Sequence, residues 1–227
     1  MMTDLSLLHQ WMFLLSGMIL FTSFAILEQA RLVATIHVFS WQGVLVALLT
    51  AVVALNEEHF HLFFSAAMTF FIKAMLIPWM LHRLVRRLGL DHHREMLDHP
   101  ALVTMLAIIL VIFSYWLVLP IVSAELQFSR NIIAISLAVV LIGFLMMVVK
   151  HQAVAQVLGF MSIENGLFMA AVSATGGMPL IVELGVAFDV LVAMVLFGVF
   201  FFQIRESIDS LDVDQMNRLS EQEDTET

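Results

Sequence analysis

The sequence contains no cysteine among its 227 residues. This absence excludes disulfide bonds, thiolate-bound zinc, iron–sulfur ligation by this chain and a cysteine nucleophile. Basic residues are also scarce, with 10 Lys and Arg against 19 Asp and Glu, so the formal net charge is -9. Most of the net negative charge lies in residues 205–227, and an acidic chain is a poor partner for nucleic acid. We find no phosphate-cradling glycine loop and no nucleophile elbow, so the sequence offers no catalytic centre of its own.

Charged residues of either sign are few, at 13% of the chain, whereas 61% of the residues are hydrophobic and the mean hydropathy is +0.98. A soluble domain carries roughly a quarter charged residues. No soluble fold of this length could bury so much apolar side chain. The composition therefore predicts an all-α, polytopic membrane protein.

Apolar stretches long enough to cross a bilayer, which takes about 20 residues, recur along the chain. We predict about seven transmembrane helices, at 6–27, 32–55, 60–81, 101–122, 131–149, 153–175 and 180–203. The first stretch has no Lys or Arg before it and no small-residue cleavage site after it, so we interpret it as a retained helix rather than a signal peptide.

The basic residues between these spans fall almost entirely on one side of the membrane. That side holds Arg31, Arg83, Arg86, Arg87, Arg94, Lys150, Arg205 and Arg218. Only Arg130 lies in a loop on the other side. Because cytoplasmic loops are enriched in Lys and Arg, we predict an outside N-terminus, a cytoplasmic C-terminus and a location in the inner (cytoplasmic) membrane. Leu81 to Leu90 has apolar residues at helical spacing with arginines between them, which predicts a short amphipathic helix on the cytoplasmic surface.

Glu164 lies near the middle of the sixth span. Gly159, Ser162, Gly166, Ala170 and Ser173 share one face of that helix, which favours close approach of another helix. Glu164 points about 140° away from that face, so we expect it to meet a different neighbour. A centred charge costs about 2.5–3.5 kcal/mol on insertion scales, so we favour reversible protonation of Glu164 over a permanently protonated, purely structural carboxyl.

Four further ionisable residues are candidates for a proton pathway. Glu183 and Asp189 lie on the seventh span, about 9 Å apart along the axis and 120° apart around it, so they do not share a face. Relay and structural roles stay equally open for both. Lys73, near the centre of the third span and five residues before Pro78, is either a relay member or the partner of a buried carboxylate. His37 in the second span is the weakest candidate, because a lone membrane histidine is more often part of hydrogen-bonded structure.

The segment 91–99 contains His, Asp and Glu side chains but no recognised ligand spacing. We interpret it as a solvated loop or a subunit contact rather than a metal site.

Two stretches resemble a known family, the membrane subunit called hydrogenase-4 component E. The first is Gln156 to Phe168, which contains Glu164, and the second is Glu183 to Asp189, followed by Ser210 to Asp214. The last three spans also resemble the small K-type subunit of respiratory complex I. The resemblance implies proton-pathway glutamates at Glu164 and Glu183, whereas Asp189, Lys73 and His37 lie outside the pattern that it covers.

The resemblance further implies a division of the chain and a set of partners. Residues 1–122 would form a four-helix region with a cytoplasmic loop at 82–100. Residues 123–204 would form a three-helix, K-subunit-like region, and 205–227 an acidic cytoplasmic tail. Expected partners are antiporter-like and small membrane subunits, lipids and a peripheral hydrogenase arm. That arm would contain the nickel–iron centre and the iron–sulfur clusters, since no cofactor is expected in this chain.

The sequence thus favours a non-catalytic subunit of a hydrogenase-4 or formate hydrogenlyase type of complex, in which buried carboxylates move protons. Two alternatives stay open, a purely structural bridging subunit and a component of a multi-subunit cation/proton antiporter.

Overall fold

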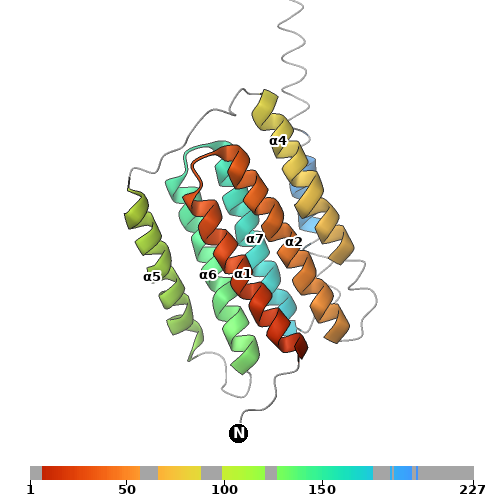
Figure 1. The fold of residues 1–227 in the computed structure, drawn as a ribbon, viewed down its shortest axis with the longest axis vertical. Coiled ribbons are helices and arrows are strands. Elements are labelled where there is room, and N and C mark those ends of the chain that lie inside the picture. Colours follow the sequence, from red (N-terminus) through yellow and green to blue (C-terminus); the bar gives the residue numbers. More distant parts are fainter. Residues whose placement is uncertain are drawn as a thin grey trace, which may run out of the picture.

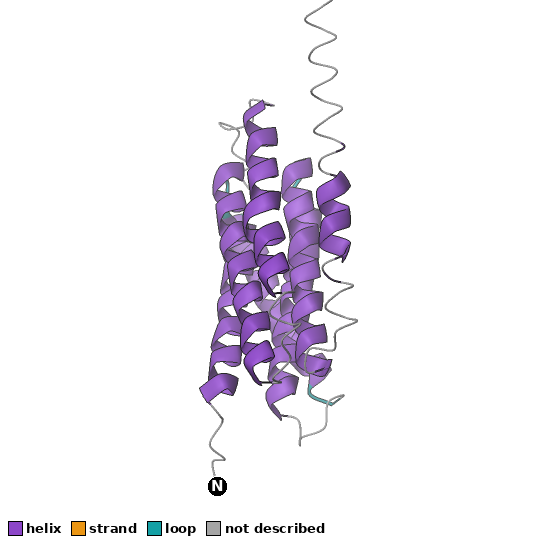
Figure 2. Ribbon diagram, turned by 90° about the vertical axis from the view of Figure 1, so that its right-hand side faces the viewer, coloured by secondary structure: helices purple, strands orange, loops and turns teal. Residues whose placement is uncertain are grey.

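The computed structural model describes residues 7–56, 66–87, 99–120, 127–175, 185, 187–195 and 198. These residues form helices and short connections without any strand. The elements are α1 (Leu7–Glu28), α2 (Leu32–Asn56), the π-helical η1 (Phe70–Leu76), α4 (Ile77–Arg87), α5 (Pro100–Val118), α6 (Gln127–Val149) and α7 (Ala153–Thr175). The helices run side by side along a common direction (Figures 1 and 2).

Six helical stretches in the described part of the chain are long and apolar enough to cross a membrane. Their bounds are His9–Glu28, Leu32–Leu55, Ala66–Arg87, Pro100–Val118, Arg130–Val149 and Ala153–Ala174. These stretches match six of the predicted spans and confirm a multi-pass, all-helical membrane protein. The seventh predicted span, 180–203, falls largely outside the described residues. Within this span, residues 187–195 are described and helical. The count of seven and the orientation of the termini stay predictions.

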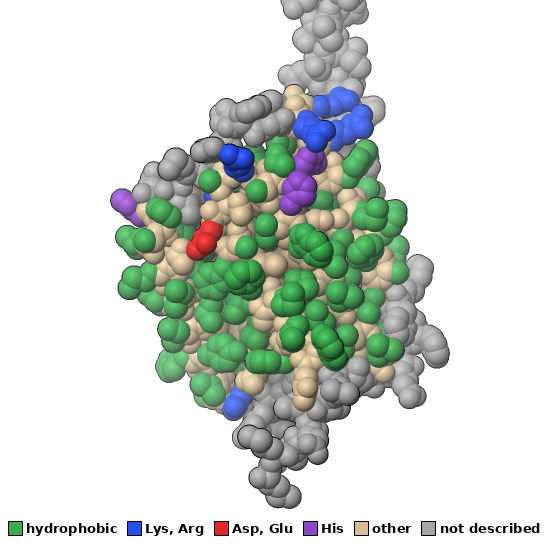
Figure 3. All heavy atoms as spheres, viewed as in Figure 1, with side chains coloured by type: hydrophobic (Ala, Val, Ile, Leu, Met, Phe, Trp, Pro, Cys, Tyr) green, Lys and Arg blue, Asp and Glu red, His purple; other side chains and the backbone are tan. Residues whose placement is uncertain are grey.

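The centre of the bundle is the pair α6 and α7, which make the most extensive contact between any two helices. Helix α1 packs on α2 and α6, and α2 also packs on α7 and η1, so the first and second halves of the chain share one bundle. Helix α5 lies at the edge, against α6 and α1 (Figure 1). Large apolar side chains such as Phe21, Ile112 and Trp116 remain exposed. Hydrophobic side chains also cover the middle of the face in Figure 3, as expected for a surface that meets lipid.

Glycines allow the close contact between α6 and α7. A Cβ atom on Gly143 of α6 would lie 2.9 Å from the carbonyl oxygen of Gly159 on α7. A Cβ atom on Gly166 would lie 2.9 Å from the carbonyl oxygen of Ser136. The predicted small-residue face of the sixth span is thereby confirmed at Gly159 and Gly166, and α6 is the helix that it meets.

The third span differs from its predicted form. Residues 66–87 form one continuous helix, because η1 passes directly into α4. The segment from Leu81 to Arg87 is therefore the end of a spanning helix rather than a separate surface helix. Its amphipathic character is nevertheless present, since Leu81, Leu84 and Val85 are buried.

We predict that Gly143→Ala lowers the free energy of unfolding by about 1–3 kcal/mol, the usual cost of overpacking. The added methyl group would stand 2.6 Å from Cγ1 of Ile163 unless the helices move apart. The measurement is thermal unfolding of the purified chain in detergent. The matched control is Gly17→Ala, where nothing lies within 4 Å of the added Cβ atom. Equal effects at the two positions would contradict the packing argument, because alanine improves helix propensity by a similar amount at both.

Candidate functional site: a buried lysine with two carboxylates

Lys73 is held on a π-helical turn at the middle of its helix. The next turn contains Pro78, which has no N–H for the carbonyl oxygen of Ala74 four residues earlier. Ser40 of α2 compensates, because its hydroxyl donates to that oxygen at 2.6 Å. The N–H of Ile77 bonds to the carbonyl oxygen of Ile72, five residues back, which is the π-helical pattern. Short π-helical turns of this kind often occur at functional sites.

Helix α2 approaches this turn closely at Gly43. A Cβ atom there would lie 3.0 Å from Cβ of Lys73 and 3.1 Å from its carbonyl carbon. The absent side chain lets α2 cover the backbone of the lysine, whose own side chain has no exposed surface.

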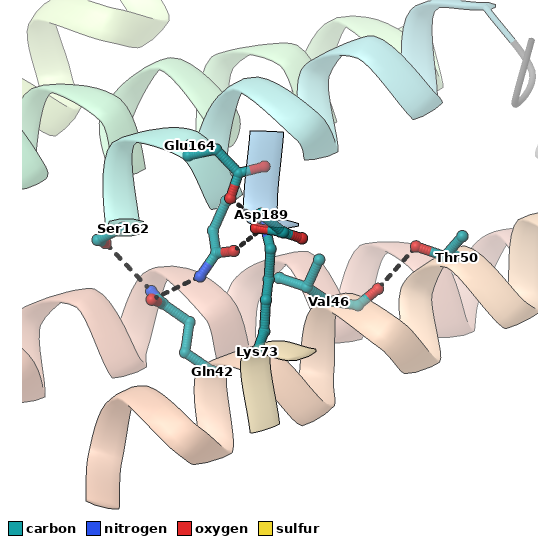
Figure 4. Close-up of polar contacts among 8 residues, drawn as sticks. Gln42, Val46, Thr50, Lys73, Ser162, Glu164 and Asp189 are labelled. Carbon is teal, nitrogen blue, oxygen red and sulfur yellow. Dashed lines mark hydrogen bonds and ion pairs between the residues drawn. The ribbon is translucent and has the colours of Figure 1, made fainter. Parts of the chain in front are cut away.

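The ammonium group of Lys73 meets three oxygen acceptors. It donates to Oε2 of Glu164 and, at 2.8 Å, to Oδ1 of Asn165, both on α7. Its Nζ also lies 3.3 Å from Oδ1 of Asp189, in the helical segment 187–195. Figure 4 shows Glu164 and Asp189 converging on the end of the lysine side chain. An ammonium group has three N–H donors, so its capacity matches these three neighbours. We call Lys73, Glu164 and Asp189 the ionisable cluster.

Buried amide groups extend from the ionisable cluster to α1. Nδ2 of Asn165 donates to Oε1 of Gln42 at 3.1 Å, and Nε2 of Gln42 donates to Oγ of Ser23 at 2.8 Å. Ser162 lies beside the same amide, with its Oγ 3.4 Å from Nε2 of Gln42 (Figure 4). All four side chains are buried. Each amide offers one oxygen acceptor and two N–H donors, so the chain of bonds fixes which way Asn165 presents its oxygen to Lys73.

Glu164 differs from the other two members of the cluster in its access to the surface. Its side chain is 10% exposed, against 0% for Lys73 and 1% for Asp189. It lies in the wall of a groove of about 270 Å³ between α7 and the segment around Phe188. The other described residues that line the groove are apolar, namely Phe160, Ile163, Leu167, Phe168, Ala171, Gly185 and Phe188. The prediction that Glu164 meets a neighbour other than the one at the glycine face is thus confirmed.

Asp189 is the least satisfied member of the cluster. Its Oδ1 is buried and has no hydrogen-bond partner among the described residues, although it lies within ion-pair distance of Lys73. With all three groups ionised, the cluster has two negative charges and one positive charge. A net charge in a hydrocarbon environment is costly, and binding of one proton removes it. The arrangement can therefore hold a proton on one of two carboxylates that share a single lysine.

Of the remaining predicted site residues, only His37 lies in the described part of the chain, and it is outside the cluster. His37 is exposed on α2, with Nδ1 2.8 Å from the carbonyl oxygen of Val33 and its ring 5.3 Å from that of His82. Glu183 and the segment 91–98 lie outside the described residues. Among the described residues, no group of three or more His, Asp or Glu side chains could hold a metal ion.

Sequence reasoning missed two buried polar residues. Asn165 stands next to Glu164 in an apolar run. Its amide could have indicated a hydrogen-bonded site there, because buried amides need partners. Lys150 was assigned to a polar break between spans, but it is only 2% exposed and donates to the carbonyl oxygen of Gln29 at 2.8 Å. A basic residue at a short break between two long apolar spans gives no signal that distinguishes a solvated from a covered side chain.

Comparisons with known proteins find distant relatives along almost the whole chain. The chain is 28% identical over 205 residues to "Uncharacterized protein Rv0085" of Mycobacterium tuberculosis. This match covers 90% of this chain and 93% of that protein. The chain is also 22% identical over 205 residues to "Hydrogenase-4 component E" of Escherichia coli. This match covers 90% of this chain and 95% of that protein. No protein-family model and no solved structure matches the chain.

We predict that Lys73→Met destabilises the protein by about 3–5 kcal/mol, the usual effect of removing one partner from a buried ion pair. The substitution leaves Glu164 and Asp189 without their common cation. The triple variant Lys73→Met, Glu164→Gln, Asp189→Asn should regain most of that loss, because no ionisable group then remains in the cluster. Thermal unfolding in detergent measures both effects. A triple variant as unstable as Lys73→Met would show that packing of the lysine stem, and not charge balance, is what the single variant removes.

Proposed function

We propose that this chain is a non-catalytic membrane subunit of a complex I-related hydrogenase, of the hydrogenase-4 or formate hydrogenlyase type. Within it, Lys73, Glu164 and Asp189 hold and transfer a proton. The observation that carries the proposal is the convergence of three ionisable side chains at a buried position in an apolar bundle. The similarity to "Hydrogenase-4 component E" over 90% of the chain supports the assignment to a hydrogenase complex.

The charge balance of the cluster gives it a defined proton content. One carboxylate is neutralised by Lys73, and the second remains neutral by carrying a proton. We place this proton on Asp189, because Glu164 accepts a hydrogen bond from the ammonium group whereas Oδ1 of Asp189 lies farther from it, at an ion-pair distance of 3.3 Å. Transfer to Glu164 requires only that the ammonium group exchange one carboxylate for the other, and both already lie beside it.

Glu164 is the member that exchanges protons with the surroundings, because its carboxylate borders the groove. The proton enters or leaves through that groove when the neighbouring subunits are assembled on it. Redox chemistry occurs in partner subunits, which contain the nickel–iron centre and the iron–sulfur clusters. Conformational change or charge at the groove alters the balance between the two carboxylates.

The orientation follows from the ends of the bundle. Arg31 and Lys150 follow the C-terminal ends of α1 and α6, and Arg83, Arg86 and Arg87 lie in the last turns of α4. These three helix ends lie at one end of the bundle (Figure 1). Arg130 belongs to the first turn of α6 at the other end. We assign the arginine-rich end to the cytoplasm.

We predict that Glu164→Gln abolishes proton movement coupled to hydrogenase turnover while the complex still assembles. Glutamine keeps a hydrogen-bond acceptor for Lys73 but cannot exchange a proton. The measurement is acidification of inside-out membrane vesicles during turnover, together with the amount of complex purified. The matched control is Glu28→Gln, because Glu28 is exposed, outside the cluster and bonded to Thr104. Coupling at the wild-type level in Glu164→Gln would make Glu164 a structural residue.

We also predict that the tagged chain, purified in mild detergent, brings with it a nickel–iron hydrogenase and antiporter-like membrane subunits. Mass spectrometry of the purified material and a hydrogenase assay provide the measurement. Antiporter-like subunits without a hydrogenase would refute the assignment to a hydrogenase and support a cation/proton antiporter. This outcome is independent of the vesicle experiment, which tests the cluster itself.

A further inference from the structure

Helix α4 has a polar outer face, which distinguishes it from the other labelled α-helices of the bundle. Its inner face, with Leu81, Leu84 and Val85, is buried. Arg83 and Arg86 lie on the outer face and are exposed. The other labelled α-helices are mostly apolar on every side, and none has a comparable row of arginines on its outer face. A helix that is apolar on every side can face hydrocarbon, whereas an arginine-rich face belongs where the hydrocarbon ends. The last two turns of α4 therefore mark the headgroup level of the membrane.

A hollow of about 340 Å³ lies on this outer face. It is lined by Trp79, His82, Arg83, Arg86 and Arg87. Its volume falls within the range of about 300–1,000 Å³ that is usual for small-molecule sites. In Figure 3, basic side chains gather at this end of the bundle, with histidines directly beneath them and the hydrophobic belt below.

Contacts within the hollow hold its side chains in place. The guanidinium carbon of Arg83 lies 5.5 Å from the ring centre of Trp79, a cation–π contact. A terminal nitrogen of Arg86 lies 3.3 Å from Nε2 of His82, whose ring in turn contacts that of His37 on α2. Guanidinium groups bind phosphate oxygens in a planar, two-pronged geometry. The charge and the donors of this hollow thus fit a phosphate group.

An apolar track leads from the hollow into the hydrocarbon region. Phe71, Met75 and Trp79 follow one another at intervals of four residues along η1 and α4. They are exposed by 59%, 51% and 53%. Arg83 stands about 6 Å beyond Trp79 along the helix axis, and Arg86 about 10 Å beyond it. A ligand with an anionic head at the arginines and a long apolar chain along this track would match both parts.

We infer that the outer face of η1 and α4 binds an anionic phospholipid, with its phosphate in the arginine-lined hollow and an acyl chain along Phe71 and Met75. A free phosphate ion would use only the hollow. The inference also gives His37 a place, as a support for His82 at the edge of the headgroup site. It does not depend on the ionisable cluster or on the proposed hydrogenase function.

The experiment is native mass spectrometry of the full chain, with titration of added lipid. The probes are long-chain phosphatidylglycerol, phosphatidylglycerol with six-carbon chains, phosphatidylethanolamine and inorganic phosphate. We expect the chain to retain long-chain phosphatidylglycerol in preference to the other three. The variant Arg83→Gln, Arg86→Gln, Arg87→Gln should bind it on the order of one hundredfold more weakly, because each of the three arginines that line the headgroup hollow should contribute about one factor of five.

The matched control is Arg31→Gln, an exposed arginine in the connection between α1 and α2, outside the hollow. It should leave the affinity within twofold of wild type. Arg86→Gln alone should weaken binding about fivefold, which keeps the test valid if the triple variant is poorly folded. The inference is overturned if Arg31→Gln weakens binding of long-chain phosphatidylglycerol as much as the triple variant does. It is also overturned if the chain retains phosphatidylethanolamine equally well, or if inorganic phosphate binds as tightly as the long-chain lipid.

Discussion

A lysine ammonium group without exposed surface in an apolar bundle must have its charge balanced by neighbours inside the bundle. Lys73 meets this constraint with Glu164 and Asn165 from α7 and with Asp189 from the segment 187–195. The third span is thereby tied to α7 and to the segment after it, which lie about 90 and 115 residues later in the sequence. The hydrocarbon core of a membrane contains no water that could solvate the lysine or the carboxylates instead. The charge contacts therefore specify how these elements assemble.

Several departures from regular helix geometry coincide at this lysine. The π-helical turn, Pro78 and the close approach at Gly43 all lie within one or two turns of it. The proline and the π turn would each be unfavourable in an isolated helix, because a proline removes a backbone donor and a π turn packs less well. The hydroxyl of Ser40 satisfies the carbonyl oxygen that Pro78 leaves free. The local irregularity is thus stabilised by α2, which also supplies Gln42 to the amide network.

The sequence predicted the members of the site better than their arrangement. Glu164, Lys73 and Asp189 were each identified from the cost of an ionisable group within an apolar run, and that cost is visible in one dimension. For Lys73 the sequence left two alternatives open, a relay member or the partner of a buried carboxylate. It could not identify the partners, because a hydropathy pattern does not show which helices are neighbours in space. Gly159 and Gly166 were predictable as a contact face because their helical spacing is local. Lys150 was not, because its burial depends on the carbonyl of Gln29, which lies in another loop.

The geometry also limits where partner subunits could influence the cluster. Lys73 and Asp189 are enclosed, whereas Glu164 reaches the wall of an apolar groove. In the complex that we propose, a partner subunit would therefore act most directly on Glu164, by changing the polarity or the hydration of the groove. Glu164 and Asp189 share one ammonium group, so their protonation is coupled. When the ion pair between Lys73 and one carboxylate weakens, the ion pair with the other carboxylate strengthens. Under the proposed function, a change at the surface of the groove would in this way alter the proton occupancy of Asp189, whose side chain is only 1% exposed.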